Sequence, residues 1–147
     1  FKKRLLQQCI HIIEQRIAAA AGAIADAQDA ANAEEKSSAG DKYETSRAMS
    51  HLQKDMYARQ LQANRKELAA LNDIDCTSLY TTIAAGSYVQ CRECSFFIAA
   101  GLGKLDFEGR ILYLLSPDAP LAKIIFGKSA GQTIIFTKKE MIVETVF

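Results

Sequence analysis

The sequence predicts an α+β protein in which an N-terminal antiparallel coiled-coil hairpin precedes a small antiparallel-sheet domain with one short helix. Residues 1–75 hold two of the eight glycines and no proline, whereas residues 76–147 hold the other six glycines and both prolines. The first part carries a heptad repeat of apolar residues, and the second carries short β-rich runs separated by glycine. We therefore place a domain boundary near Asp75.

The first predicted helix runs from about Lys3 to Glu34. Ten of its sixteen residues between positions 18 and 33 are alanine, the residue with the highest helix propensity. Apolar side chains recur at alternating spacings of four and three residues, which is the a/d pattern of a coiled coil and requires a partner helix. This first seam consists of Leu6, Ile10, Ile13, Ile17, Ala20, Ile24, Ala27 and Ala31.

The second predicted helix, from about Asp41 to Asn72, supplies that partner. Its seam repeats the same spacing in Tyr57, Leu61, Asn64, Leu68 and Leu71. An offset apolar set precedes the seam and consists of Met49, Leu52 and Met56. Small, polar and turn-forming residues fill the segment between the helices, so we expect the chain to reverse with its tip near residues 35–41. Helices of about 32 residues would each be about 48 Å long.

The second part, residues 76–147, is predicted to hold five short strands and a short helix. The β-rich runs are Ser87–Cys91, Ser95–Ala100, Arg110–Leu115, Thr133–Thr137 and Met141–Val146. Pro120–Phe126 indicates a helix that Gly127 would end at the C′ position. The side chains expected to cover one face of an antiparallel sheet are Leu121, Ile124 and Ile125.

Composition and charge exclude several classes of protein. Apolar residues make up 49% and charged residues 24%, which is typical of a globular chain. A net charge of +1 is too balanced for a broad basic face, so we expect no direct sequence-specific DNA binding. The longest apolar stretches fall far below the roughly 20 residues of a membrane span, and no signal-peptide pattern opens the chain. These observations favour a cytoplasmic protein without membrane contact.

The four cysteines are irregularly spaced, which argues for reduced thiols rather than a disulfide framework. Cys91 and Cys94 form at most half of a zinc site, because a structural site needs a second ligand pair. They are better interpreted as small apolar residues in a strand or its turn. His11 and His51 stand alone and are expected on helix surfaces.

Two motifs in the second part resemble the C-terminal signature of the Gre family of bacterial transcript cleavage factors. They are Ser-Pro-x-x-Pro-Leu-Ala at residues 116–122 and Ile-x-Gly-Lys-x-x-Gly at residues 125–131, and the Gly-Ser-x-Val run at residues 86–89 is similar as well. The order of features also matches, because that family joins an N-terminal coiled-coil hairpin to an FKBP-like domain. Gln132 departs from the family pattern, which usually has Asp there.

The resemblance implies a transcription elongation factor that binds RNA polymerase. In that family the hairpin enters the secondary channel, and acidic tip residues help to hold a catalytic Mg²⁺ for cleavage of backtracked RNA. Asp41 and Glu44 match the family's Gly-Asp-x-x-Glu tip, and Ser116 and Pro117 match its polymerase-docking loop. The protein would then not be an enzyme itself: it would stimulate the polymerase's own endonuclease and share its Mg²⁺.

Alternatives remain for the tip. Asp41 as an N-cap with Glu44 three residues later also forms a capping-box-like pair, which starts a helix without any metal. In another alignment register, the Asp41-Lys42-Tyr43 step keeps the family's aromatic residue but leaves Lys36 and Ala39 at its acidic positions. Four carboxylates and two lysines give segment 34–44 a net charge of −2. A non-cleaving secondary-channel regulator is therefore the alternative function.

Two enzyme classes that such chains suggest find little support in the residues. A 3-oxoacyl carrier-protein synthase needs a buried cysteine nucleophile with basic partners in a much larger fold, whereas Cys9 lies on a predicted coiled-coil helix. Prolyl isomerase activity would rest on fold analogy alone, which does not supply the aromatic-lined pocket that the chemistry requires.

Overall fold

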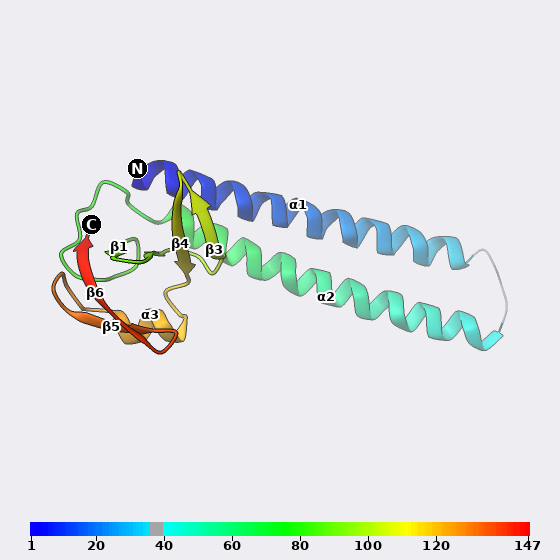
Figure 1. The fold of residues 1–147 in the computed structure, drawn as a ribbon. Coiled ribbons are helices and arrows are strands. Elements are labelled where there is room, and N and C mark those ends of the chain that lie inside the picture. The colour runs from blue at the N-terminus through cyan, green and yellow to red at the C-terminus, as the bar shows by residue number, and fades with distance from the viewer. Residues whose placement is uncertain (36–39) are drawn as a thin grey trace. The chain divides into compact units, whose positions relative to one another are not determined.

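The computed structural model describes the backbone of residues 1–35 and 40–147 and the side chains of residues 1–33 and 44–147 (Figure 1). The chain divides into two compact units. Unit 1 combines Phe1–Ile10 with Ala69–Phe147, and unit 2 is His11–Leu68. The start of the first helix and the end of the second therefore belong to the same unit as the sheet.

Two long helices form the predicted hairpin. α1 spans Lys2–Glu35 with 34 residues, and α2 spans Gly40–Asn72 with 33 residues. Within unit 2 they run in opposite directions (Figure 1). Lys54 Nζ of α2 donates a hydrogen bond to Gln28 Oε1 of α1. The helical hairpin and the α+β class are confirmed, while the predicted turn at its tip lies among residues 36–39, outside the described residues.

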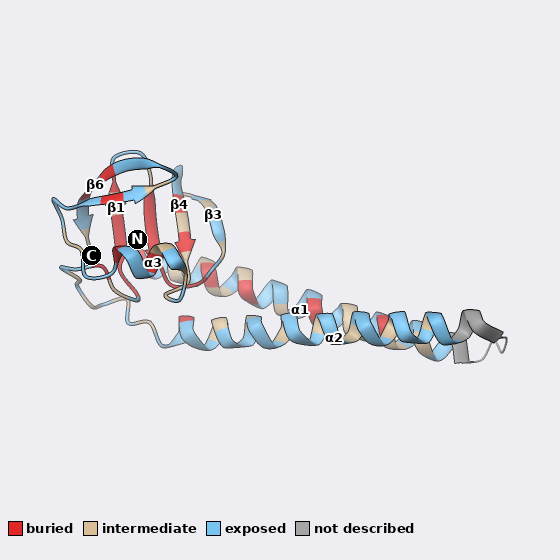
Figure 2. Cartoon of the chain, turned by 90° about the horizontal axis from the view of Figure 1, so that it is seen from below, coloured by how far each residue is buried: buried red, intermediate tan, exposed pale blue. Residues whose placement is uncertain are grey.

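The two predicted seams are the least exposed stripes of unit 2. On α1, buried and half-buried positions follow the alternating spacing predicted from the sequence, and Figure 2 shows the buried ones as red patches. The α1 seam residues of this unit are Ile13, Ala20 and Ala27, which are buried, and Ile17, Ile24 and Ala31, which are half-buried. The α2 seam residues are Tyr57, Leu61, Asn64 and Leu68, all half-buried.

The offset apolar set on α2 does not join the seam. Met49, Leu52 and Met56 are 56%, 69% and 46% exposed. The half-buried positions that continue the seam toward the tip are Ser46, Ser50 and Lys54. The offset noted in the sequence therefore turns these apolar side chains away from the seam, and the helical register brings polar side chains to the inner face.

Unit 1 contains a six-stranded sheet and a short helix, α3, at Pro120–Ile125. The strands are β1 Tyr88–Cys91, β2 Ser95–Ile98, β3 Gly103–Phe107, β4 Arg110–Leu115, β5 Thr133–Phe136 and β6 Lys139–Val146. Their order is β3-β4-β2-β1-β6-β5, and all neighbours are antiparallel except β2 and β4, which are parallel. The sheet is therefore mostly rather than wholly antiparallel, and β3 is a strand that the sequence pattern did not predict.

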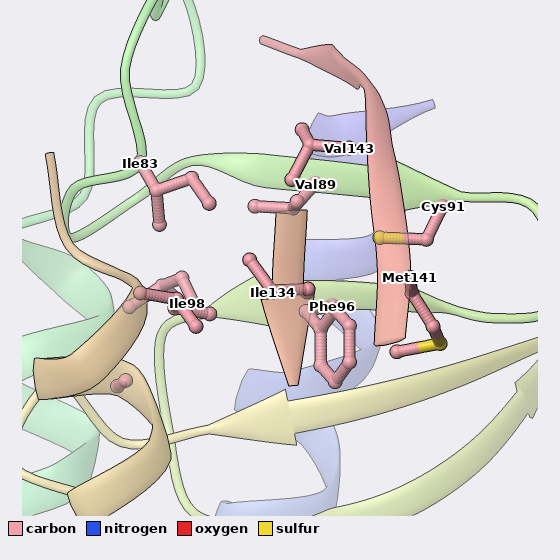
Figure 3. Packing of buried hydrophobic residues seen from close by; sticks show 10 residues of the cluster. Ile83, Val89, Cys91, Phe96, Ile98, Ile134, Met141 and Val143 are labelled. Atoms are coloured by element: carbon pink, nitrogen blue, oxygen red, sulfur yellow. The ribbon is translucent and has the colours of Figure 1, made fainter. Parts of the chain in front are cut away.

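One face of the sheet carries the core shown in Figure 3, to which β1, β2, β5 and β6 contribute. α3 packs on it through Ala122 and Ile125, both fully buried. Leu121 packs against the same cluster, as predicted. Ile124 is 68% exposed, so the prediction that it covers the sheet is wrong, because a helix of six residues presents only one side to the core.

The start of α1 packs within the same unit. The Phe1 ring lies 5.2 Å from the Tyr88 ring and 5.6 Å from the Phe107 ring, centroid to centroid. Lys2 Nζ donates a 2.9 Å hydrogen bond to the Ser78 carbonyl. Leu5 and Cys9 are fully buried here, whereas the predicted seam residues are only half-buried at this end of the helix.

Candidate functional site

The predicted tip carboxylates lie at the start of α2. The helix begins at Gly40, so Asp41 is its second residue and Glu44 its fifth. Glu44 is exposed, and residues three apart lie on one face of a helix. The Asp41 side chain and the position before Gly40 lie outside the described residues, so the capping-box alternative stays open.

Carboxylate oxygens are the ligands that Mg²⁺ prefers, so the chemistry of this pair fits the ion that the resemblance implies. Two carboxylates can fill only part of an octahedral shell. In the parts of the chain that the structure describes, no group of three or more His, Cys, Asp or Glu side chains could complete such a shell.

The predicted docking loop is a tight turn between β4 and α3 in unit 1. The Ala119 amide donates a 2.9 Å hydrogen bond to the Ser116 carbonyl, with Pro117 inside the turn. The Asp118 amide donates to the Ser116 hydroxyl at 3.3 Å. Ser116 and Pro117 are both half-buried, so each presents part of its side chain to solvent. The loop is therefore held by its own hydrogen bonds.

The remaining motif residues have a role in folding. The Ile83 amide donates to the Lys128 carbonyl at 2.7 Å, and the Gly127 amide donates to the Ile83 carbonyl at 2.9 Å. Gly127 follows α3 with a φ of +76°, as predicted for a C′ residue. Ser87 is fully buried, and its hydroxyl donates to the Ala84 carbonyl at 2.7 Å. These residues join the chain before β1 to the end of α3.

A surface with several cationic side chains lies on unit 2. A hollow of about 440 Å³ between the two helices is lined by Arg16 and Ala20 of α1 and by Tyr57 and Asn64 of α2, among others. A second hollow of about 730 Å³ on α2 is lined by Arg59, Gln62, Ala63, Arg65 and Lys66. Neither lining contains a carboxylate of the described residues. The clustering of α2 cations is visible in the sequence, but the approach of Arg16 needs the pairing of the helices.

The fold places the chain in the class of α+β proteins with an antiparallel helical hairpin followed by a small sheet domain. No protein-family model matches the chain, and no curated protein matches it. Among solved structures it is similar to the transcription factor Gfh1, with 15% identical residues and a TM-score of 0.35. That alignment covers 99% of this chain and 92% of Gfh1. A likeness of this degree assigns no function, so the residues of this chain must carry the functional argument.

Proposed function

We propose that this chain is an RNA polymerase-binding transcription elongation factor that stimulates cleavage of backtracked RNA. The observation that carries the proposal is the hairpin itself. Two helices of 34 and 33 residues flank only four residues, and two carboxylates stand at the beginning of the second helix. At 1.5 Å per residue each helix is about 50 Å long, a length that suits insertion into a deep channel.

Asp41 and Glu44 would present carboxylate oxygens to a Mg²⁺ ion held mainly by the polymerase. The ion, when bound, supplies Lewis-acid stabilisation of charge on the RNA phosphate. The partial positive charge of a helix N-terminus interacts favourably with negatively charged groups in the first turn. The chain would then contribute ligands to another protein's active site and have no nuclease activity alone.

Docking would use two further surfaces of the chain. The turn at Ser116 and Pro117 has a proline-fixed backbone, which lowers the entropy lost on binding. The hollows that Arg16, Arg59 and Lys66 help to line offer positive charge without carboxylates, which suits a negatively charged partner surface. Since both features support binding and neither supports chemistry, docking and cleavage are separable parts of the proposal.

The experiment is RNA shortening in a stalled, backtracked elongation complex, measured with and without the protein. Asp41→Asn keeps a polar oxygen but removes the charge, and Glu44→Gln does the same for the second carboxylate. Both variants are expected to bind polymerase and to lose most of the stimulation. Asp55→Asn is the matched control, because Asp55 is an exposed carboxylate on the same helix beyond the proposed tip site.

The alternative is a secondary-channel regulator that docks without promoting cleavage. It predicts that the wild type and the variants bind polymerase with equal affinity. None of them, the wild type included, would stimulate RNA shortening. Cleavage by Asp41→Asn and Glu44→Gln at the wild-type level would contradict the ligand role. Absence of polymerase binding by the wild-type chain would overturn both forms of the proposal.

A further inference from the structure

Three sulfur-bearing side chains gather at one end of the sheet in unit 1. Cys91 ends β1, Cys94 immediately precedes β2, and Met141 lies on β6. Cys94 Sγ lies 3.8 Å from Met141 Sδ. Cys91 and Met141 both belong to the buried cluster of Figure 3, and Cys94 packs against it. Sulfur from three segments of the chain is thus brought to one place.

The strand register fixes how the two cysteines face each other. Gln90 of β1 pairs with Ser95 of β2. The next pair toward the connecting turn is therefore Cys91 opposite Cys94. The Cys91 amide donates a 3.0 Å hydrogen bond to the Cys94 carbonyl. Opposite residues of an antiparallel pair have Cα atoms about 5.5 Å apart and side chains on the same face. Both thiols therefore point to the same side of the sheet.

The register of β6 brings the thioether to the same side. Cys91 pairs with Val143, and Met141 is two residues before Val143 on β6. Residues two apart on a strand share a face. Met141 therefore occupies the diagonal position relative to Cys91, within reach of a long side chain.

The cluster is shielded but reachable. Cys91 is 4% exposed and Met141 8% exposed, while Cys94 is half-buried. A hollow of about 210 Å³ is lined by both cysteines together with Arg92, Arg110 and their neighbours. A small ion can approach the thiols from this side, whereas a bulky reagent meets the surrounding side chains first.

We propose that Cys91, Cys94 and Met141 form a binding site for Cu(I), a soft monovalent cation. Two thiolates and a thioether are the ligands that select Cu(I) over harder ions. A metal–sulfur bond of about 2.3 Å places two sulfur ligands of a three-coordinate ion about 4 Å apart. This is close to the 3.8 Å between Cys94 Sγ and Met141 Sδ.

Harder or four-coordinate ions fit this site poorly. Structural zinc takes four ligands, and no third His, Cys, Asp or Glu joins the two cysteines among the residues that the structure describes. Glu93 also lines the hollow, but its carboxylate is engaged elsewhere, because Oε2 lies 3.7 Å from Lys139 Nζ in an exposed ion pair. Three sulfur ligands without a fourth ligand distinguish Cu(I) from Zn²⁺ here.

Binding would replace two S–H bonds with two metal–sulfur bonds and release two protons to solvent, while the thioether donates a lone pair without losing a proton. Burial raises the pKa of the Cys91 thiol to about 11 and also raises the pKa of Cys94. The free thiols are therefore protonated at neutral pH. The bound site would carry one net negative charge, which Arg92 and Arg110 at the hollow would offset.

The test is anaerobic competition for Cu(I) between the reduced full-length chain and a coloured chelator such as bicinchoninate. The wild-type chain is expected to take up a single Cu(I) ion, with X-ray absorption showing a shell of sulfur only. Cys91→Ser and Cys94→Ser are expected to abolish uptake, and Met141→Leu to weaken it. Cys76→Ser is the control, because Cys76 is a half-exposed free thiol outside the cluster.

Circular dichroism of each variant checks that it is folded. If the cysteine variants do not fold, Met141→Leu still tests the site, because this exchange nearly conserves side-chain volume. Failure of the reduced wild-type chain to compete would overturn the proposal. So would full uptake by a Cys91→Ser, Cys94→Ser double variant, loss of uptake in Cys76→Ser, or unchanged affinity in folded Met141→Leu. Equal binding of Zn²⁺ at the same residues would overturn the assignment of a soft-ion site.

Discussion

The hydroxyl oxygen of Tyr80 lies 2.7 Å from the point where a Cβ atom on Gly86 would stand. Gly86 also has a φ of +86°, a conformation that side chains with a Cβ rarely adopt. The Cγ2 methyl group of Ile74 lies 3.2 Å from the same point. Both the backbone and the packing therefore require glycine immediately before the buried Ser87.

Gly86→Ala is expected to lower the free energy of unfolding by about 3 kcal/mol, because it combines a strained φ with overpacking. Gly103→Ala is the matched control, since Gly103 has a φ of +78° but no atom within 4 Å of its Cβ position. That variant should lose only about 1 kcal/mol. Urea unfolding of both variants measures the difference, and equal losses would show that Tyr80 does not limit the site.

Two leucines on α2 provide a test of its register. Leu71 is fully buried and Leu52 is 69% exposed. Leu71→Ala is expected to cost about 2–5 kcal/mol through lost burial and a cavity. Leu52→Ala should change stability by less than about 0.5 kcal/mol. Similar losses in thermal or urea unfolding would mean that Leu52 packs against the hairpin after all.

The hairpin could be predicted because its signal is local and repeated. An alternating four-and-three spacing determines which side of each helix is buried, and Ile13, Ala20 and Ala27 lie there. The base of α1 could not be predicted in the same way. Leu5 and Cys9 are buried within unit 1, and the other residues of that unit, 69–147, lie far away in sequence.

β3 was missed for a physical reason as well. It is an edge strand, and its residues carry charges on the exposed side, Lys104 and Asp106, with only Leu105 and Phe107 half-buried. Charged edge strands limit edge-to-edge association but have weak apolar patterns. Within the candidate site, two positions could be predicted from the sequence: Glu44 near the start of the second helix, and Ser116 in the turn before the short helix. The hollow that Arg16 helps to line depends on helix pairing, whereas the hollow at Arg59 and Lys66 is lined by α2 alone.

Asp75 is predicted to make stability depend on acid pH. Its carboxylate accepts hydrogen bonds from the Thr77 hydroxyl at 2.6 Å, the Ser78 hydroxyl at 2.7 Å and the Thr77 amide at 2.8 Å. These bonds lower the pKa of Asp75 to about 2, and the Thr77 hydroxyl has the largest effect. Because the folded pKa lies below the unfolded value of about 3.9, the stabilisation is present above pH 4 and is lost as the pH falls through 2.

Urea unfolding of the wild type and Asp75→Asn between pH 7 and pH 2 measures this effect. The wild type should be the more stable protein at pH 7, and the gap should close toward pH 2. Asp73→Asn is the control, because within the described chain the exposed Asp73 side chain accepts no hydrogen bond. A gap that stays constant with pH would contradict the low pKa of Asp75.

Pro117→Ala tests the proposed docking turn. The exchange releases the fixed φ of the turn, so affinity for polymerase should fall while the melting temperature stays nearly unchanged. Pro120→Ala, at the first residue of α3, is the control and should keep the affinity. Titration of purified polymerase with each variant gives the answer, and identical affinities would remove the turn from the interface.

β6 pairs with β1 on one side and with β5 on the other, so the strand that comes sixth in sequence fills an interior place in the described sheet. Val89 pairs with Val146, and contacts between such distant residues form slowly because a long loop must close first. During synthesis on a ribosome, the two long helices can pair early, whereas the sheet must wait until Val146 has emerged. Phe1–Ile10 belongs to the same unit as that sheet. A segment that is synthesised well before the sheet is therefore among the last to find its packing partners.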